Sequence, residues 1–308
     1  MTNTLTSNEA LTVARALEQR RQEQRWGRFL HTVKKLRVGV AAGVFLVLLV
    51  IVAVLAPVIS PHDPYAGEII DRLQPPFWEA GGSTNFLLGT DGVGRDVLSR
   101  LIYASRVSLL VGVLSTVISA LLGVLLGLAS GYLGRYVDAV VSMMVNIMLT
   151  FPFILLALAV IAVLGGGMFN LILVLGIAGW PIYSRVVRAE VMRIKELDYV
   201  SAAKVLGFTS WRIVFRHILP NLLNAIIVLC SIQVARVIIS EAFLSFLGLG
   251  IKPPTPTWGN MLGESRNFMY DKWWLPTFPG LAIFITTLAI NLFGDALRDY
   301  LDPYSRNY

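Results

Sequence analysis

The sequence predicts an all-α integral membrane protein with six transmembrane helices. Of its 308 residues, 56% are hydrophobic and 15% are charged, whereas an ordinary soluble domain has about 45–50% and about 25%. The mean hydropathy is +0.68, and the apolar residues fall in long runs without a charge. Such runs are typical of helices that cross a bilayer. A soluble enzyme and a disordered chain are therefore excluded.

Residues 38–59 form the first uncharged run. As a helix, this run is about 33 Å long at ~1.5 Å per residue, which matches a hydrocarbon core of about 30 Å. It is longer than the roughly 7–15 apolar residues of a cleaved signal peptide, so we expect a retained anchor. The segment before it, residues 1–37, is basic. Its residues 8–30 have helical character, and they are expected to lie on an anionic inner leaflet or to form a solvated helical tail.

Four further runs supply the other five spans. Residues 107–134, 221–240 and 273–294 each supply one helix, the last with paired tryptophans at its start as an interfacial anchor. Residues 139–184 supply two helices, because a run of 46 residues is too long for one crossing and contains three consecutive glycines at 165–167. Six spans are therefore expected.

The placement of Lys and Arg sets the orientation. With the N-terminus inside, 18 of the 26 basic residues lie in inside segments and 7 in outside segments, while Arg236 lies within a span. Both termini are therefore expected to be cytoplasmic, and the pI near 9.7 needs no nucleic-acid partner. The predicted organisation is a membrane core at residues 107–294, external segments at 60–106 and 241–273, and cytoplasmic segments at 1–37, 185–220 and 295–308.

The inside loop 185–220 is too long for a simple turn. Asp198 is expected to cap a short helix that ends at Gly207, where glycine can take a positive φ. A second short helix follows from position 211, and Pro220 fits the first turn of the fifth span. Because Ala202 and Ala203 leave one helix face nearly bare, this surface helix is suited to a partner's groove, although an ordinary amphipathic linker has the same pattern.

Three glycines, Gly123, Gly127 and Gly131, recur every four residues of the second span. They share one helix face and are expected to allow close helix packing. In the third span Asn146 and Thr150 lie one turn apart, just before Pro152, which disrupts a backbone hydrogen bond. This polar, kinked stretch is expected to line a substrate path or to form hydrogen bonds between helices.

Arg236 lies inside an apolar span, where a charge at the bilayer centre costs about 2.5–3.5 kcal/mol. It is expected to face protein or water, and either to bind a carboxylate of the substrate or to pair with Glu241. On the outer side, Asp91, Arg95 and Asp96 stand among glycines. They are expected to contact an external protein or to hold the local loop by their own hydrogen bonds.

The sequence contains no Gly-x4-Gly-Lys-Ser/Thr phosphate loop, no paired-cysteine metal motif and no Gly-x-Ser-x-Gly motif. Its single cysteine, Cys230, cannot form an intrachain disulfide. An integral membrane enzyme would need such groups clustered at one interface. An ion-coupled carrier would need buried Asp, Glu or His in mid-membrane. Neither pattern is present, so both alternatives are disfavoured.

The loop motif Ser201-Ala202-Ala203-x3-Gly207-x9-His217-Ile218-Leu219-Pro220 resembles the loop of ABC importer permeases that docks on the ATPase subunit. Ser201 replaces a glutamate of that family and His217 an isoleucine. Three further blocks resemble the C-type permease subunit of peptide transporters. They begin with Leu88-Gly89-Thr90-Asp91, with Glu241-Ala242-Phe243-Leu244 and with Asn291-Leu292-x-Gly294-Asp295.

This resemblance implies a type I ABC importer permease with a cytoplasmic coupling helix and no catalytic or metal site. The implied docking residues are Ser201, Ala202, Ala203, Lys204, Gly207, Leu219 and Pro220. The chain is expected to bind no cofactor, because ATP and Mg²⁺ belong to two partner ATPases. The other implied partners are a second, homologous permease that is expected to be distinct, an external solute-binding protein, and lipid.

The segment Pro75-Pro76-x-Trp78 before the Leu88 block is most similar to dipeptide permeases. A di- or oligopeptide is therefore the expected substrate, imported across a bacterial cytoplasmic membrane by alternating access. Nickel and glutathione importers share much of the pattern and stay open as alternatives.

Overall fold

The computed structural model describes residues 37–301. Nearly all of the predicted N-terminal segment 1–37 and the end of the tail 295–308 lie outside the described residues. Within residues 37–301 the structure is helical, with irregular loops and a single isolated β-bridge between Thr90 and Asp96.

Five helices are long and apolar enough to cross a membrane, and the bent pair α3 and α4 makes a sixth crossing when it is counted as one span. Six crossings are therefore confirmed on that count. The five are Arg37–Ile59, α2 (Val97–Leu133), α5 (Met168–Ile194), the continuous helix Ser210–Phe246 and α10 (Trp274–Leu301). The pair consists of α3 (Arg135–Thr150) and α4 (Phe153–Leu164).

Helix α2 begins ten residues before the uncharged run that predicted it. Asp96 caps it by accepting a hydrogen bond from the backbone N–H of Ser99 at 2.9 Å. The residues at 97–106, predicted to belong to the external segment 60–106, are the first part of this helix. Their two arginines broke the apolar run, but Arg100 pairs with carboxylates and Arg106 lies 6.0 Å from the ring of Tyr103. Paired charges are compatible with a helix at this position.

The three glycines of α2 lie against α5, as their spacing predicted. A Cβ atom at Gly123 would lie 2.4 Å from Cβ of Tyr183 and 2.5 Å from the carbonyl oxygen of Trp180. A Cβ atom at Gly127 or at Gly131 would also lie within 3 Å of α5. Further along this contact, Ser119 donates a hydrogen bond of 2.7 Å to the carbonyl oxygen of Gly176. Close helix packing through small residues is thus confirmed.

The third crossing is broken at Phe151–Pro152, where α3 and α4 meet at 86°. Proline has no N–H, and its ring disfavours a helical conformation in the residue before it, so the predicted kink becomes a sharp bend. Helix α4 then ends at Gly165, whose φ is +83°. The predicted break at 165–167 between the third and fourth crossings is therefore confirmed.

The fifth crossing is longer than its uncharged run and starts eleven residues before it. It consists of α7 (Ser210–Ile213), a wide π-helical turn η2 (Val214–Ile218) and α8 (Leu219–Phe246). Pro220 lies at the start of α8, as predicted. The wide turn comes directly before this proline, where a regular helix would leave a carbonyl group without its donor.

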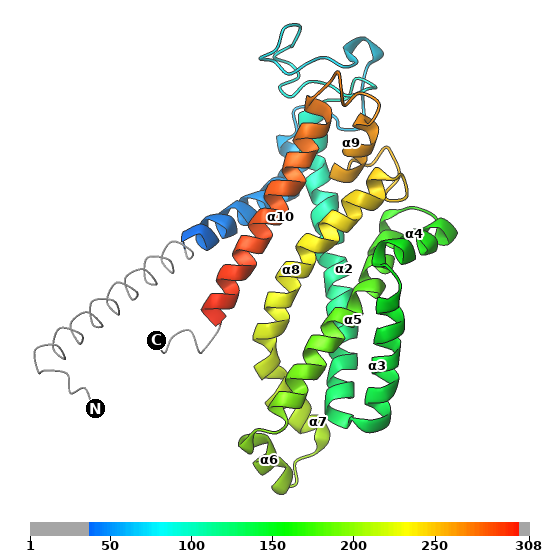
Figure 1. Cartoon of the computed structure of the whole chain (residues 1–308). Helices are drawn as coiled ribbons and strands as arrows, with labels where there is room; N and C mark the ends of the chain where they lie inside the picture. The colour runs from blue at the N-terminus through cyan, green and yellow to red at the C-terminus, as the bar shows by residue number, and fades with distance from the viewer. Residues whose placement is uncertain (1–36, 302–308) are drawn as a thin grey trace, which may run out of the picture.

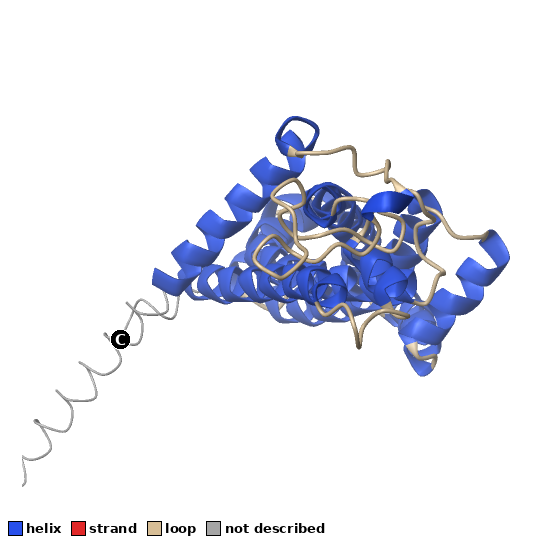
Figure 2. Ribbon diagram, turned by 90° about the horizontal axis from the view of Figure 1, so that it is seen from above, coloured by secondary structure: helices blue, strands red, loops and turns tan. Residues whose placement is uncertain are grey.

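The loop of residues 60–96 and α9 (Trp258–Ser265) lie at one end of the bundle, and α6 (Asp198–Val205) lies at the other end (Figure 1). The loop contains the short helix η1 (Ile69–Asp71) and crosses over the bundle end in Figure 2. Separate apolar clusters pack at the two ends and beside α4. The helix Arg37–Ile59 packs on α10, where a Cβ at Gly39 would lie 2.1 Å from Cβ of Ala296.

Candidate functional site

Helix α6 is held rigidly at the end of the bundle. Val200 and Ala203 are buried in the chain's own apolar cluster with Val187, Val191 and Ile218. The helix ends at Gly207, which has a φ of +75° and donates its N–H to the carbonyl oxygen of Lys204. The predicted helix and its glycine stop are confirmed. The cap is different, because Leu197 occupies the N-cap position and Asp198 lies in the first turn, near the positive end of the helix dipole.

The prediction of a bare face through both alanines is wrong. Ala203 faces inward and is only 4% exposed, because the cluster under α6 needs a small residue there. The exposed face carries Ala202, Val205 and Leu206, of which Val205 is 88% and Leu206 is 72% exposed. We call these three residues the exposed patch. Apolar residues gathered on an exposed surface at the end of the bundle are typical of a protein contact.

The other predicted docking residues differ in exposure. Ser201, Lys204, Gly207 and Pro220 are exposed, whereas Leu219 is half-buried. His217 is also half-buried, and its ring stacks on Phe208 with centroids 5.9 Å apart. The histidine that replaces the isoleucine of the family motif therefore makes an aromatic contact within the chain. Docking itself stays a prediction.

The predicted outer residues form a charged cluster that ties three segments together. Arg100 of α2 donates to Asp91 of the loop and to Glu264 of α9, each at 2.5 Å. Arg95 bridges the same two carboxylates at 2.7 and 2.8 Å. Asp96 is buried as the cap of α2. The internal hydrogen bonds account for all three predicted residues, so an external contact would have to use their exposed neighbours.

We expect Arg100→Met to destabilise the protein by about 2 kcal/mol, which is the scale of a lost hydrogen bond to a charged group. The loss is limited because Arg95 still neutralises both carboxylates. Arg95→Met is the matched control. Its side chain is 12% exposed rather than 2%, so its loss should be smaller. Thermal unfolding of the purified protein in detergent measures both, and equal stability of Arg100→Met and wild type would contradict this account.

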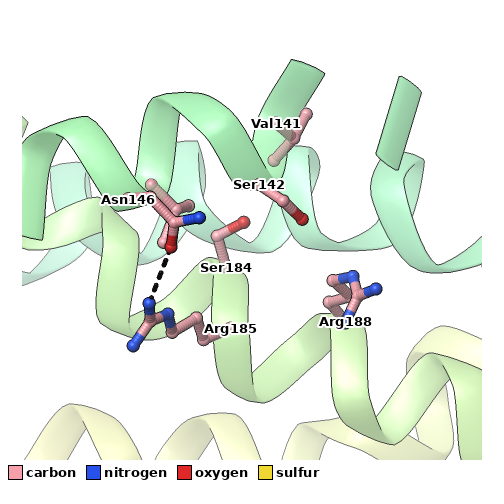
Figure 3. A pocket seen from close by; sticks show the side chains of 7 residues that line it. Val141, Ser142, Asn146, Ser184, Arg185 and Arg188 are labelled. Carbon is pink, nitrogen blue, oxygen red and sulfur yellow. Dashed lines mark hydrogen bonds between the residues drawn. The ribbon is translucent and has the colours of Figure 1, made fainter. Parts of the chain in front are cut away.

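Two cavities lie in succession along α5. The first, of about 380 Å³, is lined by residues of α2, α5 and α8 and by the corner between α3 and α4, including Ser119, Pro152, Gly179, Ile182, Gln233, Arg236 and Ser240. The second, of about 430 Å³, lies between α3 and α5 and is lined by Val141, Ser142, Val145, Asn146, Ser184, Arg185 and Arg188 (Figure 3). We call them the outer and inner cavities.

The hydrogen bond between helices predicted for Asn146 is confirmed, whereas its place on a substrate path stays a prediction. Asn146 lines the inner cavity and accepts a hydrogen bond of 2.9 Å from Nη2 of Arg185 on α5 (Figure 3). Thr150 donates to the carbonyl oxygen of Asn146 at 2.7 Å. Arg188 on the other side of the inner cavity forms an ion pair with Asp138. Arg185 was missed because it ends the uncharged run and was assigned to the loop.

Arg236 and Glu241 are separated in the structure. Arg236 is exposed and lines the outer cavity, and no ion pair joins it to Glu241 or to another of the residues at 37–301. Glu241 is fully buried and accepts hydrogen bonds from Ser245 at 2.8 Å and Ser108 at 3.3 Å. The suggested pairing is therefore wrong, since Glu241 turns into the α2–α8 contact. Glu241 lines neither of the two cavities.

Comparison with known families identifies two regions. Residues 123–307 match the model of the binding-protein-dependent transport system inner membrane component. Residues 24–76 match the N-terminal transmembrane domain of oligopeptide transport permease C. Together these regions contain five of the six crossings, α6 and most of both cavities.

The relatives include the dipeptide transport system permease protein DppC of Escherichia coli strain K12, which is 49% identical over 89% of this chain and 92% of that protein. The di/tripeptide transport system permease protein DppC of Pseudomonas aeruginosa is 42% identical over 92% of both chains. The glutathione transport system permease protein GsiD of Pectobacterium atrosepticum is 41% identical over 90% of this chain and 89% of that protein.

The fold is also similar to that of a solved structure. An inward-facing conformation of the MetNI methionine ABC transporter superposes with a TM-score of 0.55 at 19% identity, covering 66% of this chain and 96% of that one. The chain has several membrane crossings, its residues 123–307 match the family model, and 89% of its length aligns with the permease of Escherichia coli. It therefore belongs to the family of inner membrane components of binding-protein-dependent transport systems.

Proposed function

We propose that this chain is one of two permease subunits of an ATP-driven importer of di- or oligopeptides. The observation that carries this proposal is the exposed patch on α6, an apolar surface packed against one end of a bundle whose membrane core contains cavities with polar groups in their linings. The substrate class is supported by the similarity to dipeptide permeases over about nine-tenths of the chain. The chain itself is proposed to be non-catalytic.

Energy for transport has to come from another subunit. Moving a two-state equilibrium from 1:99 to 99:1 requires about 5.5 kcal/mol of differential binding. The sequence has no phosphate loop to bind ATP, so ATP and Mg²⁺ are assigned to two partner ATPases that grip α6. Because Val200 and Ala203 are packed into the bundle end, a displacement of α6 would be transmitted directly to α2, α5 and α8.

A second permease subunit is proposed to complete the path. Arg236, Arg185 and Asn146 are exposed on the surface of this single chain, where lipid would solvate them poorly. A homologous subunit facing the two cavities would enclose them. We propose a distinct partner, because residues 24–76 of this chain match the N-terminal transmembrane domain of oligopeptide transport permease C, one particular kind of permease component.

The predicted orientation places α6 and both termini in the cytoplasm of a bacterial cell and the outer charged cluster outside the inner membrane. The distribution of 18 basic residues inside and 7 outside supports it. An external solute-binding protein would then deliver substrate to the end that carries α9 and the loop of residues 60–96 (Figure 1).

Uptake by the complete complex in proteoliposomes tests the proposal. Labelled dialanine should enter only with ATP inside and the binding protein outside, and excess unlabelled dipeptide should compete. Uptake of glutathione or Ni²⁺ without dipeptide uptake would replace the substrate class and leave the ATP-driven import intact. Uptake driven by a proton gradient without ATP would overturn the proposed function.

A further inference from the structure

Two arginines of the membrane core lack a carboxylate partner within the described residues. The guanidinium group of Arg236 makes no hydrogen bond or ion pair there, and Arg185 donates only to the neutral amide of Asn146. Arg188 on the same helix differs, because Asp138 neutralises it in an ion pair. These two positive charges are therefore not neutralised by the chain, and they make the electrostatic potential around them positive.

The two arginines line successive cavities. Gly179 and Ile182 of α5 line the outer cavity with Arg236, and Arg185, only three residues after Ile182, lines the inner cavity. Residues three or four apart share a helix face, so this face of α5 forms one continuous wall. At ~1.5 Å per residue, the wall from Gly179 to Arg188 is about 13 Å long.

The lining of the outer cavity resembles a small-molecule site. Most of it is apolar, and its polar groups are Arg236, Gln233, Thr116, Ser119 and Ser240. Ligand pockets typically combine apolar walls with a few polar groups, at volumes of about 300–1,000 Å³, and this cavity measures about 380 Å³. Arginine binds carboxylates through a planar, bidentate contact.

We propose that the two cavities form an anion-selective groove in which Arg236 and then Arg185 hold the C-terminal carboxylate of the peptide as it crosses the membrane. This inference rests on the proposed function and adds to it the substrate group that is recognised and the residues that recognise it. Apolar side chains of the peptide would lie against Phe153 and Ile182, while the carboxylate moves from the outer to the inner arginine.

Charged thiol reagents test the groove without requiring transport. In a Cys230→Ala background, Ser240→Cys places a thiol in the outer cavity and Ser142→Cys places one in the inner cavity. Each is treated, in the whole complex, with anionic sulfonatoethyl and cationic trimethylammonioethyl methanethiosulfonate. Rates are normalised to those of a free thiol. Both positions are expected to prefer the anionic reagent.

Arginine variants then test whether Arg236 and Arg185 cause the preference for the anionic reagent. Arg236→Gln should lower the anionic-to-cationic rate ratio at position 240 about tenfold, the scale of one charge-assisted hydrogen bond, and Arg236→Lys should retain it. Arg185→Gln should lower the ratio at position 142. The matched control is Arg193→Gln, which removes the same charge from the same helix outside both cavities, where Arg193 pairs with Glu190. Ratios unchanged by both Arg236→Gln and Arg185→Gln would overturn the groove.

Protection by substrate tests the assignment of the carboxylate. In the Cys230→Ala, Ser240→Cys background, dialanine is expected to slow modification at position 240 when Arg236 is present and not when Arg236→Gln is added. An anionic preference without such protection would overturn the carboxylate assignment. If the complex imports no peptide at all, the proposed function fails, while the rate ratios still decide whether the groove selects anions.

Discussion

Val205→Asp is expected to abolish ATP-driven transport while the chain stays folded in the membrane. Val205 is 88% exposed on α6, so a charge there costs the isolated chain little, within about 0.5 kcal/mol. In the proposed complex the same position lies in an apolar groove of the ATPase, where an unpaired carboxylate loses its water. Co-purification of the ATPases with the tagged variant and uptake in vesicles measure the two effects.

Two other variants make this experiment specific. Val205→Ala keeps the surface apolar and should retain ATPase binding and most transport. Ala203→Asp places the charge into the cluster beneath α6, where the native side chain is 4% exposed. That variant should reduce the amount of folded protein, a different failure from loss of docking. Normal ATPase binding by Val205→Asp would show that the exposed patch is not the docking surface.

Gly123→Ala is expected to destabilise the membrane core by about 3 kcal/mol, at the upper end of overpacking effects. The added Cβ would lie 2.5 Å from the carbonyl oxygen of Trp180 and 2.4 Å from Cβ of Tyr183. Neither atom is the end of a flexible side chain, so α2 and α5 would have to separate. The folded fraction in detergent and the thermal midpoint are the readouts.

Gly280→Ala is the matched control for this substitution. Gly280 also lies in a membrane helix, α10, but no atom would approach an added Cβ within 4 Å. Since alanine favours a helix over glycine by about 0.5–1 kcal/mol, this variant should be neutral or slightly stabilised. Similar losses in both variants would mean that close approach of α2 and α5 is not what requires Gly123.

The long uncharged runs predicted the crossings because the cost of burying charge in lipid restricts their composition. Their ends were less predictable, since paired charges allow a helix to continue. Arg100 is an example, because its partner Glu264 is 164 residues away in the sequence. A composition argument cannot locate such a partner, so α2 was predicted ten residues too short.

The candidate site was predicted in type but not in orientation. The spacing of Ala202 and Ala203 indicated a surface helix, but which alanine faces the bundle depends on the cluster formed by α5, η2 and α8. Likewise, Arg236 and Glu241 are close in sequence, yet hydrogen bonds from Ser108 and Ser245 hold Glu241 within the protein. One signal could have identified Arg185 as a lining residue. It is a basic residue three positions after Ile182, on a helix that extends to Ile194.

The central claim is that this chain works as a membrane subunit gripped by separate ATPases. Its most direct test is gentle extraction of the tagged chain from its native membrane, followed by mass spectrometry of the intact complex and its bound small molecules. The account predicts two ATPase subunits, one homologous permease and a peptide-loaded binding protein. A chain that is recovered alone, and that stays alone after crosslinking through Lys204 beside the exposed patch, would contradict it.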